Sequence, residues 1–288
     1  MLDMGRRRGL RIAGLTLLAG ATAMPAAASA TITIGSNLGR EPDVGTSCNP
    51  SCTQVQASLS SALSAPGGVV SPVNGTVVTW RVRTGVTNTS PSALQVVRVL
   101  ANGTAVATAT SATVTPPVSA IQPFAAQLPI GIGESIGISC CLNTSSKIFV
   151  NEPGAAQRNS YLPALVDGGS PQPQFIGSPT PYEVAISAII EPTATLGSVK
   201  AKSKKGGKIK VTMVAPNPGA LFASGKGLHS SPRQQVPAAG PFSLVVKPYF
   251  VAKRKLAAGK TVKTKLKLTF IPTGGSAAVQ ALKVKLKP

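Results

Sequence analysis

Apolar and polar residues alternate with a period of two along most of this chain, a pattern that predicts short β-strands. Within residues 77–84, Val78, Trp80 and Val82 share one face, so we expect Trp80 to be a core residue. The dipeptide Asn102-Gly103 separates two strand-like stretches and indicates a tight hairpin, because both of its residues accept a positive φ. Strand-like stretches in this part of the chain are residues 31–34, 77–84, 94–101, 104–110, 128–132, 135–140, 147–150 and 182–190.

The last third of the chain alternates more regularly, and lysine is its usual polar residue. Residues 208–214, 262–270 and 282–287 each have one apolar face and one lysine face, and residues 221–224 and 242–246 add shorter strands. Lysine rows also protect exposed strand edges from aggregation. In residues 31–192, no stretch of ten residues has a convincing helical period, and the Pro-, Gly-, Ser- and Gln-rich residues 152–181 are interpreted as a long surface loop.

Charge divides the chain sharply. The 288 residues carry a net charge of +21. Residues 31–192 have six basic and seven acidic residues, whereas residues 193–288 have nineteen basic residues and no acidic one. A shift of this kind marks a domain boundary, here within residues 191–196. We therefore predict an all-β protein with two β-sandwich domains, jelly-roll-like over residues 31–192 and immunoglobulin-like or fibronectin-III-like over residues 193–288.

The first thirty residues have the pattern of a signal peptide. Four arginines between positions 6 and 11 precede an apolar stretch at residues 12–24, and Ala28-Ser29-Ala30 fits the small-residue cleavage rule. Cleavage is predicted after Ala30. The apolar stretch is short for a membrane span. We expect an extracellular or envelope-associated protein without a transmembrane segment after cleavage.

Several segments resemble a known kind of secreted protein. The motifs Gly-Gly-Lys-Ile-Lys-Val-Thr at 206–212 and Thr-Phe-Ile-Pro-Thr-Gly-Gly at 269–275, with residues 218–221, 224–228, 238–241 and 256–260 between them, resemble the Lys-rich C-terminal Ig-like repeat of secreted proteins from high-GC actinobacteria. Residues 48–53, 79–83, 128–130 and 137–138 resemble a module that precedes this repeat. The resemblance covers most of the chain after residue 30. It implies a secreted β-sandwich protein and carries over no catalytic residue.

Four cysteines in an exported chain predict disulfides. They are Cys48, Cys52, Cys140 and Cys141, which allow one local pairing, Cys48–Cys52 with Cys140–Cys141, and two crossed pairings. A crossed bridge would close a loop of roughly ninety residues and contribute about 4 kcal/mol in the chain-entropy model. The Cys-x3-Cys segment of the resemblance favours the local pair. Adjacent cysteines are a poor spacing for zinc, so no metal site and no cofactor are predicted.

One motif resembles the sequence pattern that surrounds a catalytic serine nucleophile. Residues 133–137 read Gly-Glu-Ser-Ile-Gly, a pattern that has meaning for Ser135 only on a strand–turn–helix with an acid and a histidine following. Here the motif lies between two strand-like stretches, and the one histidine, His229, belongs to the other predicted domain. We interpret the motif as a polar turn and assign no catalytic residue, so the chain is predicted not to be an enzyme.

Two groups of residues are candidates for binding. Lys263, Lys265, Lys267, Lys283, Lys285 and Lys287 could bind a polyanion such as an anionic cell-wall polymer or an acidic polysaccharide. Tyr161 and Phe175, in the predicted loop, could stack on a sugar. Nothing typical of specific nucleic-acid recognition accompanies the lysines.

Three functions remain open from the sequence. The preferred one is a non-enzymatic secreted or envelope-associated protein whose basic domain binds anionic envelope polymers and whose first domain is a candidate for binding carbohydrate or protein. The alternatives are a secreted hydrolase of wall or matrix polysaccharide and a purely structural surface protein. A hydrolase would need a pair of carboxylates, such as Glu134 with Glu183 or Asp167 with Glu191.

Overall fold

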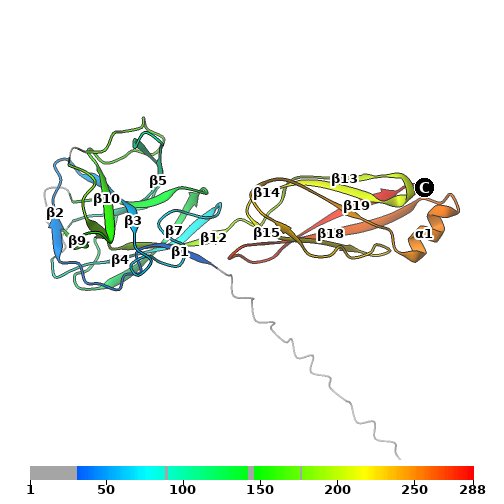
Figure 1. Ribbon diagram of the computed structural model, residues 1–288, viewed down its shortest axis with the longest axis horizontal. Helices are drawn as coiled ribbons and strands as arrows, with labels where there is room; N and C mark the ends of the chain where they lie inside the picture. Colours follow the sequence, from blue (N-terminus) through cyan, green and yellow to red (C-terminus); the bar gives the residue numbers. More distant parts are fainter. Residues whose placement is uncertain (1–30, 88–89, 142–145, 176) are drawn as a thin grey trace, which may run out of the picture.

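The computed structural model describes residues 31–87, 90–141, 146–175 and 177–288. These residues form antiparallel sheets with one α-helix and one short 3-10 turn (Figure 1), which confirms the predicted all-β sandwich fold. The signal peptide predicted at residues 1–30 lies outside the described residues. Within those residues, no helix has the length and apolar character needed to cross a membrane.

Residues 31–192, here called the N-terminal half, contain three sheets. The four-stranded sheet has the order β1 (Ile32–Gly35), β12 (Ile186–Pro192), β4 (Gly75–Arg83) and β7 (Ile121–Ile130). The five-stranded sheet has the order β10 (Ala156–Tyr161), β3 (Cys52–Leu59), β8 (Ser135–Cys140), β5 (Ala93–Val99) and β6 (Ala105–Thr110). The three-stranded sheet consists of β11 (Tyr182–Val184), β9 (Ser146–Asn151) and β2 (Val44–Thr46).

The apolar faces of these sheets form the core of the N-terminal half. Trp80 on β4 is 1% exposed and packs against Phe124 on β7, with their ring centroids 4.9 Å apart, so the prediction that Trp80 is a core residue is confirmed. The predicted Asn102-Gly103 turn joins β5 to β6. Gly103 has a φ of 81°, and Leu100 N–H donates to the Thr104 carbonyl over 2.8 Å. A side chain at position 103 would be strained at this φ, so the turn favours glycine.

One expectation about secondary structure is wrong, and one helix was not predicted. Residues 152–181 are not one surface loop, because they contain β10, which pairs antiparallel with β3. The alternation pattern misses this strand because its sequence, Ala-Gln-Arg-Asn-Ser-Tyr, is mostly polar. Its buried positions hold polar side chains that form hydrogen bonds within the protein. The unexpected helix is α1 (Phe250–Ala257), whose eight residues are too few to give a clear helical period.

Residues 193–288, here called the C-terminal half, form two facing sheets around a separate core. One sheet has the order β13 (Gly197–Ser203), β14 (Ile209–Ala215) and β17 (Gly240–Val246). The other has the order β16 (Gln234–Val236), β15 (Gly219–Gly225), β18 (Val262–Pro272) and β19 (Ala278–Leu286). The 3-10 turn η1 (Lys205–Gly207) precedes β14. The regular alternation predicted for this part is present, with every second residue of β14 buried.

The two halves meet end to end at a narrow junction (Figure 1). Asn217, fully buried in the turn between β14 and β15, connects them by hydrogen bonds. Its Oδ1 accepts from Asn74 N–H over 2.7 Å, and its Nδ2 donates to the carbonyls of Asn74 (2.9 Å) and Thr193 (2.7 Å). Beside this contact, a Cβ at Gly274 would lie 2.6 Å from the Ile32 side chain, and Gly274 has a φ of 65°. The close approach of the two halves there depends on this glycine.

The four cysteines lie together where β3 and β8 pair. The disulfides are Cys48–Cys52 and Cys140–Cys141, so the local pairing is formed and the crossed pairings are not. Cys52 lies directly opposite Cys140 in the sheet, and Cys48 N–H donates to the Cys141 carbonyl over 2.7 Å. The two bridges are therefore neighbours in space although they are distant in sequence.

Candidate functional site

The outer face of β18 and β19 carries a lattice of lysines. In the register of this strand pair, Lys263 lies opposite Lys285 and Lys265 lies opposite Lys283. These side chains are exposed, because the alternate residues of both strands face the core. The structure thus brings the predicted polyanion-binding residues onto one face: Lys263, Lys265, Lys267, Lys283, Lys285 and Lys287.

The spacing of this lattice follows from strand geometry. Alternate residues on one strand are about 7 Å apart, and neighbouring strands about 5 Å apart. Like charges that face each other directly across a strand pair destabilise the sheet. A cavity of about 390 Å³ lies among Lys263, Lys265, Lys283 and Lys285. An anionic chain bound there would offset the mutual repulsion of the lysines.

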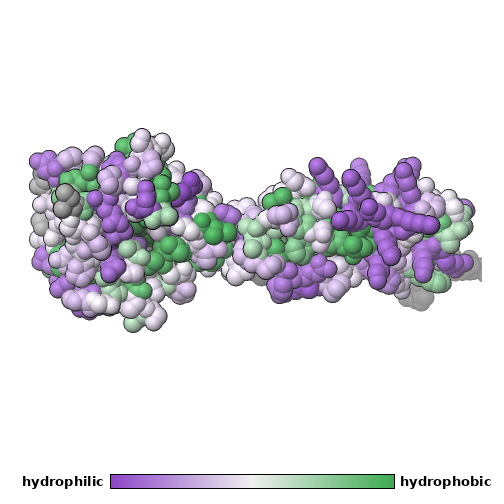
Figure 2. Space-filling model, turned by 45° about the horizontal axis from the view of Figure 1, so that its top comes forward, coloured by the Kyte–Doolittle hydropathy of each residue, from purple (hydrophilic) through white to green (hydrophobic). Residues whose placement is uncertain are grey.

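Lysines are also paired on the other sheet. Lys202 on β13 lies directly opposite Lys210 on β14, and both are exposed. Figure 2 shows strongly hydrophilic side chains standing out along the C-terminal half. Since the sequence of this half contains no acidic residue, none of these lysines can be neutralised by a side chain of its own half. The arrangement gives the half a positive field that attracts anions and weakens with salt.

The end of the C-terminal half combines aromatic and basic side chains. A cavity of about 550 Å³ there is lined by Gly206, Lys208, His229, Lys247, Pro248, Tyr249, Phe250 and Lys253. The rings of His229 and Tyr249 meet edge to face with centroids 4.9 Å apart, and Phe250 is 62% exposed. His229 is exposed and lies in the C-terminal half, away from Ser135.

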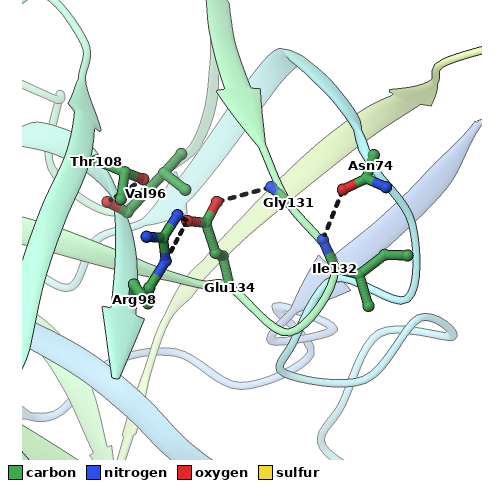
Figure 3. A network of polar contacts seen from close by, with 7 residues as sticks. All are labelled: Asn74, Val96, Arg98, Thr108, Gly131, Ile132 and Glu134. Carbon is green, nitrogen blue, oxygen red and sulfur yellow. Dashed lines mark hydrogen bonds and ion pairs between the residues drawn. The ribbon is translucent and has the colours of Figure 1, made fainter. Parts of the chain in front are cut away.

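The Gly-Glu-Ser-Ile-Gly motif ends the turn between β7 and β8 and begins β8, so the predicted polar turn between two strands is present. Ser135 begins β8 and is 6% exposed. The Glu134 carboxylate closes the turn by accepting from Gly131 N–H over 2.7 Å and from the Arg98 guanidinium over 2.8 Å (Figure 3). Glu134 therefore stabilises the turn, and a buried serine at the start of a strand is poorly placed to attack a substrate.

The other acidic residues considered for a hydrolase are held by separate structural contacts. Glu183 on β11 is 1% exposed and its Oε1 accepts from the Ser36 hydroxyl. Asp167 accepts from the Thr110 hydroxyl at the outer side of β6. Burial raises the pKa of Glu183 above its ordinary value; the Ser36 hydrogen bond opposes this rise, and the charge of Glu152 adds to it. Glu134 and Glu183 thus belong to different hydrogen-bond groups, which gives no support to a catalytic pair of the two.

The raised pKa of Glu183 predicts a pH-dependent stability. In the unfolded chain this carboxyl ionises near its ordinary pKa of about 4.3, whereas the folded protein favours the neutral form. The stabilisation of the folded state by the Glu183 carboxyl is therefore fully present below the ordinary pKa. It is lost as pH rises through the raised pKa of the folded state. Glu183→Gln, which resembles the neutral acid, is expected to raise the urea midpoint at about pH 7 and to change it little at about pH 4. Glu41→Gln, at an exposed residue, is the control; a midpoint for Glu183→Gln that falls at pH 7 would contradict this account.

The two residues predicted to stack on a sugar differ in their surroundings. Tyr161 is fully buried on β10, and its hydroxyl donates to the Gly103 carbonyl over 3.3 Å. A buried ring has no face free for a sugar, so Tyr161 is a core residue and the expectation is corrected. Phe175 is 50% exposed and lines a cavity of about 320 Å³ in the N-terminal half. It remains available for stacking.

Sequence reasoning missed Arg158, which lines the same cavity and is 6% exposed. It lies in the segment interpreted as a loop, where an arginine is ordinarily solvated, and nothing local in the sequence marks it. In the described ranges, no three His, Cys, Asp or Glu side chains are grouped so as to hold a metal ion.

Comparisons with known proteins add little to this geometry. No protein-family model matches the sequence, and no curated protein matches it. Among solved structures, a β-glucuronidase from Faecalibacterium prausnitzii is matched over 81% of this chain and 37% of its own, at 13% identity and a TM-score of 0.20. A β-1,2-glucanase from Parabacteroides distasonis is matched over 76% of this chain and 28% of its own, at 8% identity and a TM-score of 0.17. The chain spans well under half of either protein, and neither likeness bears on its function.

Proposed function

We propose that this protein is exported and acts without catalysis, by binding an anionic polymer of the cell envelope through its C-terminal half. The observation that carries the proposal is the pair of directly opposed lysines on β18 and β19, Lys263 with Lys285 and Lys265 with Lys283. Folding places four like charges where they repel one another, in a half whose sequence has no acid. A bound polyanion turns this repulsion into attraction.

The spacing of the lysines favours a linear polymer over a single small anion. Charges about 7 Å apart along each strand can be matched by a chain that repeats an anionic group at each short sugar or polyol unit. The exposed aromatic rings of Tyr249 and Phe250, next to Lys247 and Lys253, offer further contact to the carbon skeleton of such a chain. The predicted signal peptide directs the protein to the compartment that holds these polymers.

The test measures binding of the protein to two polymers with the same backbone over a range of salt concentrations. We expect the full chain to bind immobilised dextran sulfate and not neutral dextran, and binding to fall steeply as added salt shortens the screening length from about 10 Å at 0.1 M to about 3 Å at 1 M. Isolated cell envelopes should follow the same salt dependence. Equal retention on neutral dextran, or binding that does not change with salt, would refute the proposal.

A further inference from the structure

The N-terminal half buries one positive charge without a counter-charge. Arg158 on β10 is 6% exposed, and its Nε donates to the Thr180 hydroxyl over 3.0 Å. Its guanidinium carbon lies 4.4 Å from the ring centroid of Phe149 and 5.1 Å from that of Tyr182. The Nη1 atom is buried and has no hydrogen-bond partner, and in the described part of the chain the ion pairs of the acidic residues are made with Arg40 and Arg98.

Such an arrangement is costly for the folded protein alone. Removing an arginine from water destabilises the folded state unless an anion and further hydrogen bonds compensate the charge. The aromatic rings supply part of this compensation. Burial lowers the pKa of Arg158 to about 10, so the side chain is still charged at neutral pH. Arg158 thus lines the cavity with a charge that neither of the described ion pairs neutralises, and an anionic ligand in the cavity would compensate this charge.

Arg158 lines an open cavity of about 320 Å³ whose walls are polar and fixed. Ser160 Oγ donates to Gln54 Oε1 over 2.6 Å, and Ser178 Oγ accepts from Ser160 N–H over 3.0 Å. Residues that line the cavity with hydroxyl or amide groups are Thr46, Ser47, Asn49, Gln54, Ser160, Ser178 and Thr180. Among the described residues that line this cavity, Arg158 is the only charged one.

The remaining wall is apolar and includes a ring. Phe175 is half-exposed, and its backbone N–H donates to the Ser160 carbonyl over 2.8 Å, which fixes its loop against β10. Leu162 and the Cys48–Cys52 bridge complete this side. A cavity with one cation, several hydroxyls and one aromatic face suits a compact ligand that carries one anionic group, several hydroxyl groups and an apolar ring face.

We propose that this cavity binds a small hydroxylated carboxylate of the size of one acidic sugar. The carboxylate accepts a charge-assisted hydrogen bond from the part of the Arg158 guanidinium that lines the cavity. The sugar hydroxyls bond to the serine and threonine side chains, and the sugar ring lies against Phe175. This site is separate from the lysine face, and it would exist even if the C-terminal half bound nothing.

The first experiment is calorimetric titration of the full chain with glucuronate and, in parallel, with glucose, which has the same ring and no carboxylate. We expect glucuronate to bind with a Kd of about 1 mM or tighter and glucose at least about tenfold more weakly. Equal affinities for the two sugars would overturn the proposal, as would the absence of heat and of any chemical-shift change with glucuronate. Tighter binding of glucose 6-phosphate than of glucuronate would assign the site to phosphate instead and refute the carboxylate.

Variants locate the binding in the cavity. Arg158→Gln is expected to weaken glucuronate binding by about tenfold or more. The reason is that the loss of one charge-assisted hydrogen bond of modest strength raises the Kd by about that factor. Because this residue is buried, a second variant avoids the risk of misfolding. Ser47→Trp places an indole at an exposed residue of the cavity rim and should abolish binding, whereas Ser170→Trp, at an exposed residue outside the cavity, should leave it unchanged. If the Ser47→Trp variant bound glucuronate as tightly as the unmodified protein does, glucuronate would bind outside this cavity.

Discussion

Reversing one charge in each opposed lysine pair, by Lys265→Glu together with Lys285→Glu, is expected to weaken binding to dextran sulfate by about tenfold or more at low salt. The same double variant is expected to unfold at a higher urea concentration than the unmodified protein. The reason for both effects is the strand register, which places Lys283 opposite residue 265 and Lys263 opposite residue 285. Two repulsive pairs become two attractive pairs, and the polymer loses its site.

The control for this variant keeps the net charge equal. Lys255→Glu with Lys260→Glu makes the same change in charge at two exposed residues, one on α1 and one just after it, that do not face each other across a strand pair. We expect it to weaken polymer binding less and to leave the urea midpoint nearly unchanged. Equal losses of affinity in the two double variants would mean that net charge alone decides binding and would contradict a site on β18 and β19.

Asn217→Ala is expected to loosen the junction between the two halves while leaving both cores folded. The amide of Asn217 accepts from Asn74 N–H and donates to the carbonyls of Asn74 and Thr193, and the residue is fully buried. Its removal leaves buried polar groups unpaired, at a cost of about 1–3 kcal/mol for each. A loss of about 2 kcal/mol corresponds to a change of about 30-fold in the local opening equilibrium.

Amide hydrogen exchange measures this opening directly. We expect the amides of Asn74 and Thr193, which are bonded at the junction, to exchange about 30-fold faster in Asn217→Ala, and the amide of Val211 inside β14 to be unaffected. Asn102→Ala, which removes an exposed asparagine in the β5–β6 turn, is the control. Unchanged exchange at Asn74 and Thr193 would show that other contacts hold the halves together.

The regular strands were predictable because their information is local. The alternation in β14, β18 and β19 specifies a core face and a lysine face residue by residue, and the structure has both. The Asn102-Gly103 hairpin is a property of two residues and their φ angles. The polar turn at Glu134 followed from the strand-like stretches on either side of it.

Features that depend on distant segments were not predictable in this way. β10 consists of polar residues and is a strand only because β3 pairs with it. Tyr161 is buried for the same reason. The pairing of the cysteines was left open by the residues themselves, and in the structure each cysteine is bridged to its nearer neighbour in sequence.

The sequence by itself determined the all-β class and the presence of a lysine row on each of the last strands, because alternation and charge are properties of neighbouring residues. Only the tertiary structure decided which lysines oppose each other, how Asn217 joins the two halves, and that Arg158 is buried beside Phe149, Tyr182 and an open cavity. Register and burial arise from contacts between separate segments, whether these are consecutive strands, as for Lys263 and Lys285, or distant ones, as for Arg158 and Gln56. The period of a single strand carries no information about them.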